Sequence, residues 1–334
     1  MLRFFPWRES SSLAFDLGTA NIRVMSSQDG LLFDEPSICC FQRNDRSGKL
    51  VAAGIEARPM ADRAPARLRV ERPLCRGVLQ DIDAARALLR FAGDRVRSRG
   101  RASTRPTLIG VPADATQAEQ RALLTAARDA QLGPIQLVSE PIAAAIGAGL
   151  PIAEPQGCML IDCGAGTTEV VVISLGHFCV RRTVRVGGAS LDQAIADHLH
   201  FRHRFLIGEQ TAERIKLQLA EAQSSPAIAQ GMIEIRGRSL ETGGPGILAL
   251  PAATFDEVVR KHFTLIIEAV ADTLNNTPPE LSHDIYERGV TLTGGSAPFP
   301  LLAQMITDAT GLRATVADEP HHCVAKGLQK MLQN

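Results

Sequence analysis

Two short stretches of the chain repeat one pattern of residues that could hold a phosphate and a metal ion. In residues 13–25 and again in residues 159–173, an apolar run ends in an aspartate, a small-residue turn with glycine and threonine follows, and a second apolar run comes next. This pattern is typical of a tight β-hairpin. Each hairpin would hold one carboxylate, Asp16 or Asp162, beside a loop of exposed backbone N–H groups.

The loops suit a phosphate group. Glycine lets the backbone approach closely, successive N–H groups form an anion-binding concavity, and the hydroxyls of Thr19, Thr167 and Thr168 add donors. Carboxylates repel phosphate, so Asp16 and Asp162 require a cation between them and the phosphates. Mg²⁺ fits best because it takes one or two carboxylates and keeps several waters. Either stretch alone could be a surface turn with an aspartate in it, since short glycine motifs recur by chance. A matched pair argues against chance.

The same residues carry a family resemblance. DLGTAN (residues 16–21) and GAGTTEV (164–170) are similar to the first and second phosphate motifs of the actin and heat-shock chaperone ATPase superfamily. Within it the chain resembles the MreB family of bacterial actin homologues from residue 16 to about residue 327. The resemblance is clearest in EPIAAAIGAGLP (140–151) and TAERIK (211–216). It leaves open whether the chain is a main member or a specialised paralogue.

The resemblance implies an actin-like α/β fold with two lobes, each with a mixed sheet flanked by helices, and a nucleotide in the cleft between them. A length of 334 residues also favours more than one core. The expected divisions are a tail at 1–12, lobe I at 13–143 with a small subdomain at about 33–71, and lobe II at 144–317 with a small subdomain at about 182–250. A helix at about 318–334 would return to lobe I.

The resemblance also implies a site for ATP and Mg²⁺, with Asp16 and Asp162 facing the metal. Glu140 would position and activate the attacking water, with Thr167 assisting. The alternative for Glu140 is a favourable helix-dipole partner, worth about 0.3 to 1 kcal/mol. The residues expected to contact nucleotide are Gly18, Thr19, Ala20, Asn21, Gly164, Ala165, Gly166, Thr167, Thr168, Gly188, Glu213, Lys216, Gly294, Gly295 and Ser296. Glu213 and Lys216 could instead form a simple surface ion pair.

Some positions depart from the family pattern. Ala165 and Ser296 stand where relatives usually have glycine, and Ser139 replaces the usual acidic residue before Glu140. If position 165 needs a left-handed backbone, alanine costs roughly 1 to 2 kcal/mol there, which is about tenfold in ATP affinity. With ordinary backbone angles the methyl group is harmless. Two functions therefore stay open: an ATP-hydrolysing filament protein that organises cell-wall synthesis and rod shape, or a diverged scaffold that binds nucleotide weakly.

The hydrophobic pattern predicts the elements around these motifs. Residues 82–96 read as a helix and residues 107–111 as a buried strand. Thr116 with Glu119 forms a capping-box signature for a helix to about residue 130, and residues 135–138 form the next strand, parallel to the first. Residues 31–71 read as a β-rich insertion ending in a short helix. Two more capping boxes are expected, one at Ser190 with Gln193 and one at Thr254 with Glu257. Pro298 and Pro300 are expected to break the segment that follows the glycines at 294 and 295.

The arginines of the small subdomain make it strongly basic, and this face is either solvated or a filament contact. They are Arg58, Arg63, Arg67, Arg69, Arg72 and Arg76.

The composition of the chain limits the classes of binding partner that are expected. Lys+Arg and Asp+Glu both number 36, so bulk charge does not favour nucleic acid. The odd number of cysteines, seven, argues for the cytosol. Residues 1–8 crowd three aromatic side chains beside two arginines, a composition that suits anionic lipid at a bilayer interface. A tail docked on the protein's own surface is the alternative. The resemblance implies a filament of identical copies at the inner face of the cytoplasmic membrane, with cell-wall elongation proteins as partners.

Overall fold

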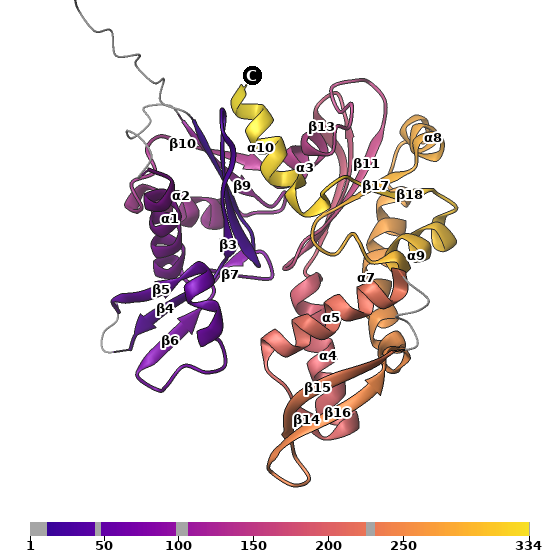
Figure 1. Ribbon diagram of the computed structural model, residues 1–334. Helices are drawn as coiled ribbons and strands as arrows, with labels where there is room; N and C mark the ends of the chain where they lie inside the picture. Colours follow the sequence, from indigo (N-terminus) through magenta and orange to yellow (C-terminus); the bar gives the residue numbers. More distant parts are fainter. Residues whose placement is uncertain (1–11, 44–47, 98–105, 225–230, 334) are drawn as a thin grey trace, which may run out of the picture.

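The computed structural model describes residues 12–43, 48–97, 106–224 and 231–333, and it forms two lobes side by side (Figure 1). Lobe I is built on a sheet with the strand order β10-β9-β1-β2-β3. Lobe II is built on a sheet with the order β13-β12-β11-β17-β18. In both, three consecutive antiparallel strands are extended by two strands parallel to the first. The two lobes therefore repeat one topology, as the paired hairpins predict.

The strands of these sheets have the following bounds. Lobe I contains β1 (Leu13–Leu17), β2 (Asn21–Ser26), β3 (Gly30–Pro36), β9 (Thr107–Val111) and β10 (Ile135–Ser139). Lobe II contains β11 (Cys158–Cys163), β12 (Thr168–Ser174), β13 (His177–Val184), β17 (Val290–Thr293) and β18 (Ala314–Val316). The predicted strands at 107–111 and 135–138 are confirmed, and they pair in parallel.

Helices cover the sheets, and each lobe carries a smaller sheet at the same end of the molecule (Figure 1). The helices are α1 (Ile82–Arg97), α2 (Gln117–Asp129), α3 (Glu140–Gly147), α4 (Gly188–His203), α5 (Glu209–Ser224), α7 (Asp256–Asn275), α8 (Pro279–Arg288), α9 (Pro300–Thr310) and α10 (Cys323–Gln333). The small sheet of lobe I is β5 (Leu50–Ala53), β4 (Cys39–Gln42) and β6 (Leu68–Glu71), and that of lobe II is β14 (Phe205–Leu206), β15 (Met232–Ser239) and β16 (Pro245–Pro251). Four 3₁₀ turns, η1 (Gly54–Glu56), η2 (Arg58–Met60), η3 (Ala252–Phe255) and η4 (Pro320–His322), and the ribbon β7 (Leu74–Cys75) with β8 (Val78–Leu79) complete the described elements.

Helices α3 and α10 join the lobes and pack against each other with little space between their backbones. A Cβ on Gly147 would lie 1.9 Å from the Cys323 carbonyl oxygen, and one on Gly327 would lie 1.7 Å from the Ala143 carbonyl oxygen. Ala143 belongs to the core under lobe I, whereas Ala144 belongs to the core under lobe II. We therefore place the division between the lobes within α3, with α10 packed on the lobe I sheet.

Some of the local predictions are confirmed by the structure and others differ from it. The capping box of Thr116 and Glu119 is confirmed. Ser190 instead lies inside α4, where its hydroxyl accepts from Gly187 N, because the glycine pair begins the helix earlier than the sequence suggests. Thr254 belongs to η3, so α7 begins at Asp256 without a side-chain cap. The break expected at the two prolines is present, since Pro298 lies in a turn and Pro300 begins α9. The insertion of lobe I is β-rich as predicted, but it ends in β6 rather than in a helix.

Candidate functional site

A cavity of about 130 Å³ lies between the lobes, at the ends of β1 and β11. Both predicted phosphate loops and both aspartates line it, together with Glu140 from the start of α3. Of the predicted site residues, those that line it are Asp16, Gly18, Thr19, Ala20, Asn21, Glu140, Asp162, Gly164, Ala165, Gly166, Thr167, Gly294 and Gly295. The two hairpins thus meet at one place, as the two-hairpin interpretation requires, and the glycines at 294 and 295 join them there.

The two hairpin loops have matching geometry and face each other closely. Gly18 N donates to the Asn21 carbonyl at 3.0 Å, and Gly164 N donates to the Thr167 carbonyl at 2.9 Å. A Cβ on Gly166 would lie 2.3 Å from Thr19 Oγ1, so only glycine fits at this approach. This spacing leaves backbone N–H groups of both loops beside the cavity, which is what a phosphate chain needs.

Both aspartates are buried at the ends of their strands. Asp16 has an ion-pair partner, and Asp162 accepts a hydrogen bond from a neighbouring hydroxyl. Asp16 pairs with Arg23 at 3.3 Å, and Asp162 Oδ1 accepts a hydrogen bond from Thr293 Oγ1 at 2.9 Å. Burial raises the pKa of Asp16 despite the Arg23 charge. Burial also raises the pKa of Asp162 to about 6, opposed by the Thr293 hydrogen bond and supported by the charge of Asp16. A cation between the two carboxylates would relieve this cost.

The residues present fit Mg²⁺ held jointly by protein and phosphate. Within the described part of the chain, no group of three or more His, Cys, Asp or Glu side chains is arranged to hold a metal ion. A cation at Asp16 and Asp162 would therefore take its other ligands from phosphate and water, which is how Mg²⁺ is commonly bound.

Glu140 is the first residue of α3, with Pro141 second. It lines the cavity. Burial, then the charges of Glu169, Asp16 and Asp162, raises the pKa of Glu140 well above its usual range. A carboxylate with a raised pKa beside a phosphate site suits a general base. Ser139, before it, caps no backbone group, and its hydroxyl has no hydrogen-bond partner among the described residues.

Glu169 is a residue that the sequence motif contains but that sequence reasoning gave no role. It lies buried on β12, and its carboxylate reaches across the cleft to accept from Ala113 N of lobe I at 2.7 Å. Burial raises the pKa of Glu169 to about 8, although the Ala113 hydrogen bond acts in the opposite direction. The sequence feature that could have pointed to Glu169 is its charge within an otherwise apolar strand.

Five of the predicted nucleotide contacts do not line the cavity. The Thr168 hydroxyl donates to the Val186 carbonyl at 2.8 Å, so it is not free to face a phosphate. Gly188 N donates to the Gly164 carbonyl at 3.0 Å and holds the start of α4 against the second loop. Ser296 lies behind that loop, where its backbone N–H donates to the Cys163 carbonyl at 3.0 Å.

Glu213 and Lys216 are the other two, and each pairs with a residue outside α5. Glu213 pairs with Arg58 of lobe I at 2.7 Å. Lys216 Nζ pairs with Asp192 at 2.8 Å and donates to the Gly188 carbonyl at 3.2 Å. The prediction that they contact the nucleoside therefore has no support from this conformation.

Of the two alternatives for Ala165, the structure has the ordinary backbone, so the methyl group causes no left-handed strain. Ala165 and Ser296 both have ordinary negative φ angles, because neither is among the described residues with positive φ. We therefore expect Ala165→Gly to change ATP affinity by less than about threefold, since no left-handed strain exists to be relieved. Titration of ATP against wild type and variant measures this directly. A tenfold tighter variant would instead mean that the methyl group obstructs the phosphates.

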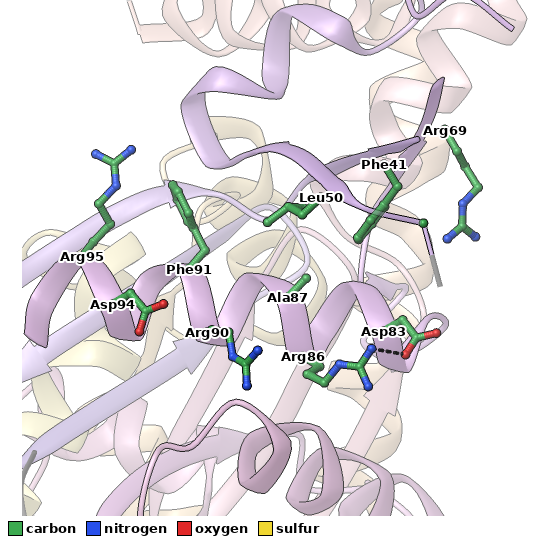
Figure 2. Close-up of a pocket in the computed structure, with 11 residues that line it drawn as sticks. Phe41, Leu50, Arg69, Asp83, Arg86, Ala87, Arg90, Phe91, Asp94 and Arg95 are labelled. Carbon is green, nitrogen blue, oxygen red and sulfur yellow. Dashed lines mark ion pairs between the residues drawn. The ribbon is translucent and has the colours of Figure 1, made fainter. Parts of the chain in front are cut away.

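A second cavity, of about 500 Å³, lies on lobe I between α1 and the small sheet (Figure 2). Phe41, Leu50 and Phe91 form its apolar wall, and the Arg69 and Arg95 guanidinium groups lie over the Phe41 and Phe91 rings at 5.4 and 4.9 Å from the ring centroids. None of the predicted site residues lines it. The cavity between the lobes is therefore the candidate site.

Two lobes of repeated topology, with paired phosphate loops and paired aspartates facing one cleft, define the actin-like class of nucleotide-binding folds. Comparison with known proteins gives the family. Residues 10–334 match the family described as MreB/Mbl protein. The chain belongs to the MreB/Mbl family.

Comparisons with individual relatives support the same family. The chain is 39% identical over 337 residues to the cell shape-determining protein MreB of Escherichia coli (strain K12), covering 100% of this chain and 96% of the relative. It is 36% identical over 322 residues to the cell shape-determining protein Mbl of Bacillus subtilis (strain 168), covering 96% of each. Its structure is similar to that of MreB5 of Spiroplasma citri bound to ADP, with a TM-score of 0.86 and 28% identity over 98% of this chain and 100% of that one.

Proposed function

We propose that this protein binds ATP with Mg²⁺ in the cleft between its lobes, hydrolyses it slowly, and assembles with copies of itself into filaments that take part in determining cell shape. The observation that carries the proposal is the meeting of the two glycine and threonine loops with Asp16 and Asp162 around one cavity. The relative MreB5 of Spiroplasma citri has structures bound to ADP and to AMPPNP, which supports an adenine nucleotide.

In this proposal the backbone N–H groups of both loops bind the phosphates, and the two aspartates hold the metal ion. Bound Mg²⁺ would neutralise phosphate charge. Glu140 accepts the proton of the attacking water, because its raised pKa and its place on the cavity wall suit that role. Thr167, which also lines the cavity, orients the water with it. Gly294 and Gly295, which line the cavity, would lie against the adenosine.

Sedimentation with nucleotide tests assembly. We expect the protein to pellet with Mg²⁺ and ATP, and to stay in the supernatant when EDTA removes the metal. Phosphate release measured on the same samples separates the two functions left open by the sequence. Pelleting that neither needs nucleotide nor releases phosphate would favour the scaffold over the ATPase.

We further propose that the filament lies at the inner face of the cytoplasmic membrane, with cell-wall elongation proteins as partners. The membrane contact would come from residues 1–8, which lie outside the described residues. Within the described part, no helix is long and apolar enough to cross a membrane. A peripheral contact through aromatic and basic side chains is compatible with that finding.

The tail should bind anionic vesicles. We expect the fluorescence of Trp7, the single tryptophan of the chain, to shift to shorter wavelength as its ring leaves water. Deletion of residues 1–8 should abolish vesicle binding and leave ATP binding unchanged, and neutral vesicles serve as the control. If the full-length protein ignores anionic vesicles both alone and polymerised, the tail has another role.

A further inference from the structure

One arginine lies among the carboxylates of the cavity between the lobes. The acidic side chains that line the cavity are Asp16, Glu140 and Asp162. Arg23 also lines it, and among the described residues that do so it is the only arginine or lysine. A guanidinium group is always charged and binds phosphate well. Arg23 is therefore the one lining side chain with a permanent charge that attracts a phosphate chain.

Arg23 is the middle member of a row of charges across three strands of lobe I. It lies opposite Asp16 in the β1–β2 pair and opposite Asp34 in the β2–β3 pair. Directly opposite residues of antiparallel strands have neighbouring side chains on one face. Arg23 Nη1 lies 3.3 Å from Asp16 Oδ2, and Arg23 Nε lies 3.1 Å from Asp34 Oδ2. The row is largely buried, since the Arg23 side chain is only 15% exposed.

Asp34 is the fixed end of this row. Its Oδ1 accepts a hydrogen bond from Asn21 Nδ2 at 2.6 Å, and its Oδ2 lies 3.3 Å from His322 Nε2. Burial acts to raise the pKa of Asp34, but the Asn21 hydrogen bond and the Arg23 charge outweigh it, so this pKa lies below its usual value. Asp34 is therefore a stable carboxylate that holds the Nε side of the guanidinium group.

Asp16 is the exchangeable end of the row. Burial raises the pKa of Asp16 although the Arg23 charge acts to lower it, so the contact with Arg23 compensates the buried carboxylate only in part. A divalent cation held between Asp16 and Asp162, as proposed above, would compensate it more strongly. The Nη1 side of Arg23 would then be released beside the phosphates that the cation binds.

We propose that Arg23 is a phosphate-binding residue: Mg²⁺ displaces its Nη1 side from Asp16, and Arg23 then binds the phosphate chain while Asp34 keeps its Nε. A guanidinium group suits this exchange because its donors point in fixed directions, so one edge can stay on a carboxylate while the other binds phosphate. The inference rests on the proposed function and deepens it, because it adds a residue of this chain that recognises the phosphates themselves.

The alternative role for Arg23 is to neutralise Asp16 in the empty site, and the two roles predict different effects on ATP. If Arg23 only competes with the metal ion for Asp16, Arg23→Gln should leave Mg²⁺-dependent ATP binding unchanged or tighten it. If Arg23 binds phosphate, Arg23→Gln should weaken ATP binding by about 10- to 100-fold, the usual effect of losing a hydrogen bond to a charged group. Arg23→Lys keeps the charge without the fork of donors and should bind with intermediate affinity.

Calorimetric titration with ligands that differ only in their phosphates gives the readout. ATP, ADP and adenosine are titrated into wild type and Arg23→Gln at saturating Mg²⁺. ATP and ADP should lose affinity in the variant, whereas adenosine should bind as it does to wild type. The matched control is Arg69→Gln. Arg69 also lies between two acidic partners, Glu71 at 3.5 Å and Asp81 at 3.3 Å, but it does not line the cavity between the lobes, so all three affinities should stay unchanged.

A second comparison serves if Arg23→Gln unfolds the protein by leaving the Asp34 carboxylate unpaired. Asp34→Asn removes that charge, so Asp34→Asn alone is compared with Asp34→Asn combined with Arg23→Gln. Both lack the carboxylate that holds Asn21, and the difference between them therefore reports Arg23. ATP affinity should be about three- to tenfold lower in the double variant, a smaller effect because Arg23 has lost its anchor. Equal ATP affinities of the two proteins would overturn the inference.

Failure of this inference and failure of the proposed function give different results. Wild-type protein that binds neither ATP nor ADP with Mg²⁺ overturns the proposed function and the role of Arg23 with it. Wild type that binds ATP while Arg23→Gln binds it equally or more tightly overturns the role of Arg23 alone. Equal losses for adenosine and ATP do the same, because Arg23 then only maintains the shape of the site. A loss confined to the ligands with phosphates establishes the proposal.

Discussion

Glu140→Gln is expected to slow ATP hydrolysis by roughly 10² to 10⁴ while leaving ATP affinity nearly unchanged. The side chain keeps its shape and its place on the cavity wall, but the amide cannot accept a proton from water. Burial and the charges of Glu169, Asp16 and Asp162 all raise the pKa of Glu140, which favours its acting as a proton acceptor. Single-turnover phosphate release measures the effect, and Thr167→Ala should lower the rate in the same direction.

A matched control separates this role from a helix-dipole contribution. Glu280 also lies in the first turn of a helix that has a proline in that turn, α8, but it is exposed and does not line the cavity. Glu280→Gln should therefore leave phosphate release unchanged. If Glu140→Gln hydrolyses ATP at the wild-type rate, Glu140 is no more than a favourable acid at the start of α3.

The central elements of both lobes could be predicted because local sequence determines them. An apolar run, a glycine turn and a second apolar run specify a hairpin without help from the rest of the chain. The capping box of Thr116 is equally local, and it was found. The meeting of Asp16 and Asp162 was predicted from chemistry, since each needs a cation that the other can share.

Contacts between lobes could not be predicted from patterns of this kind. Thr168 looks like a phosphate donor in the motif, yet its hydroxyl bonds the Val186 carbonyl, which the fold brings beside it. The three-residue spacing of Glu213 and Lys216 suggests a pair, yet each finds a partner on another element. Such partners are separated by up to 155 residues, and no periodicity records them.

Helix starts near glycine were the other source of error. Ser190 has the spacing of a cap, but Gly187 and Gly188 can begin the helix without a side-chain cap, so α4 starts before it. The methyl group of Ala165 raised a similar question, which only the backbone angle could decide. Position 165 has an ordinary angle, and the argument for weak nucleotide binding from strain is removed.

Asp162→Asn and Asp16→Asn are each expected to weaken Mg²⁺-dependent ATP binding by about 100-fold or more, since breaking a buried charge pair costs roughly 3 to 5 kcal/mol. The reason is that each carboxylate holds the cation that allows the phosphates to approach. Titration with ATP in Mg²⁺ and in EDTA measures the effect. Asp308→Asn, on the exposed face of α9, is the control.

Loss of ATP binding must be distinguished from loss of folding in these variants. The burial of the aspartates makes this possible, because replacing them should not destabilise the fold. Because burial raises the pKa of Asp162 to about 6, its charged form is disfavoured in the folded protein, and asparagine removes that charge. Asp162→Asn should therefore unfold at the wild-type temperature or above while binding is lost. Asp16→Asn leaves Arg23 its second partner, Asp34 at 3.1 Å, so it should fold as well. Tight binding of ATP by either variant in EDTA would contradict the arrangement in which the two aspartates share one cation.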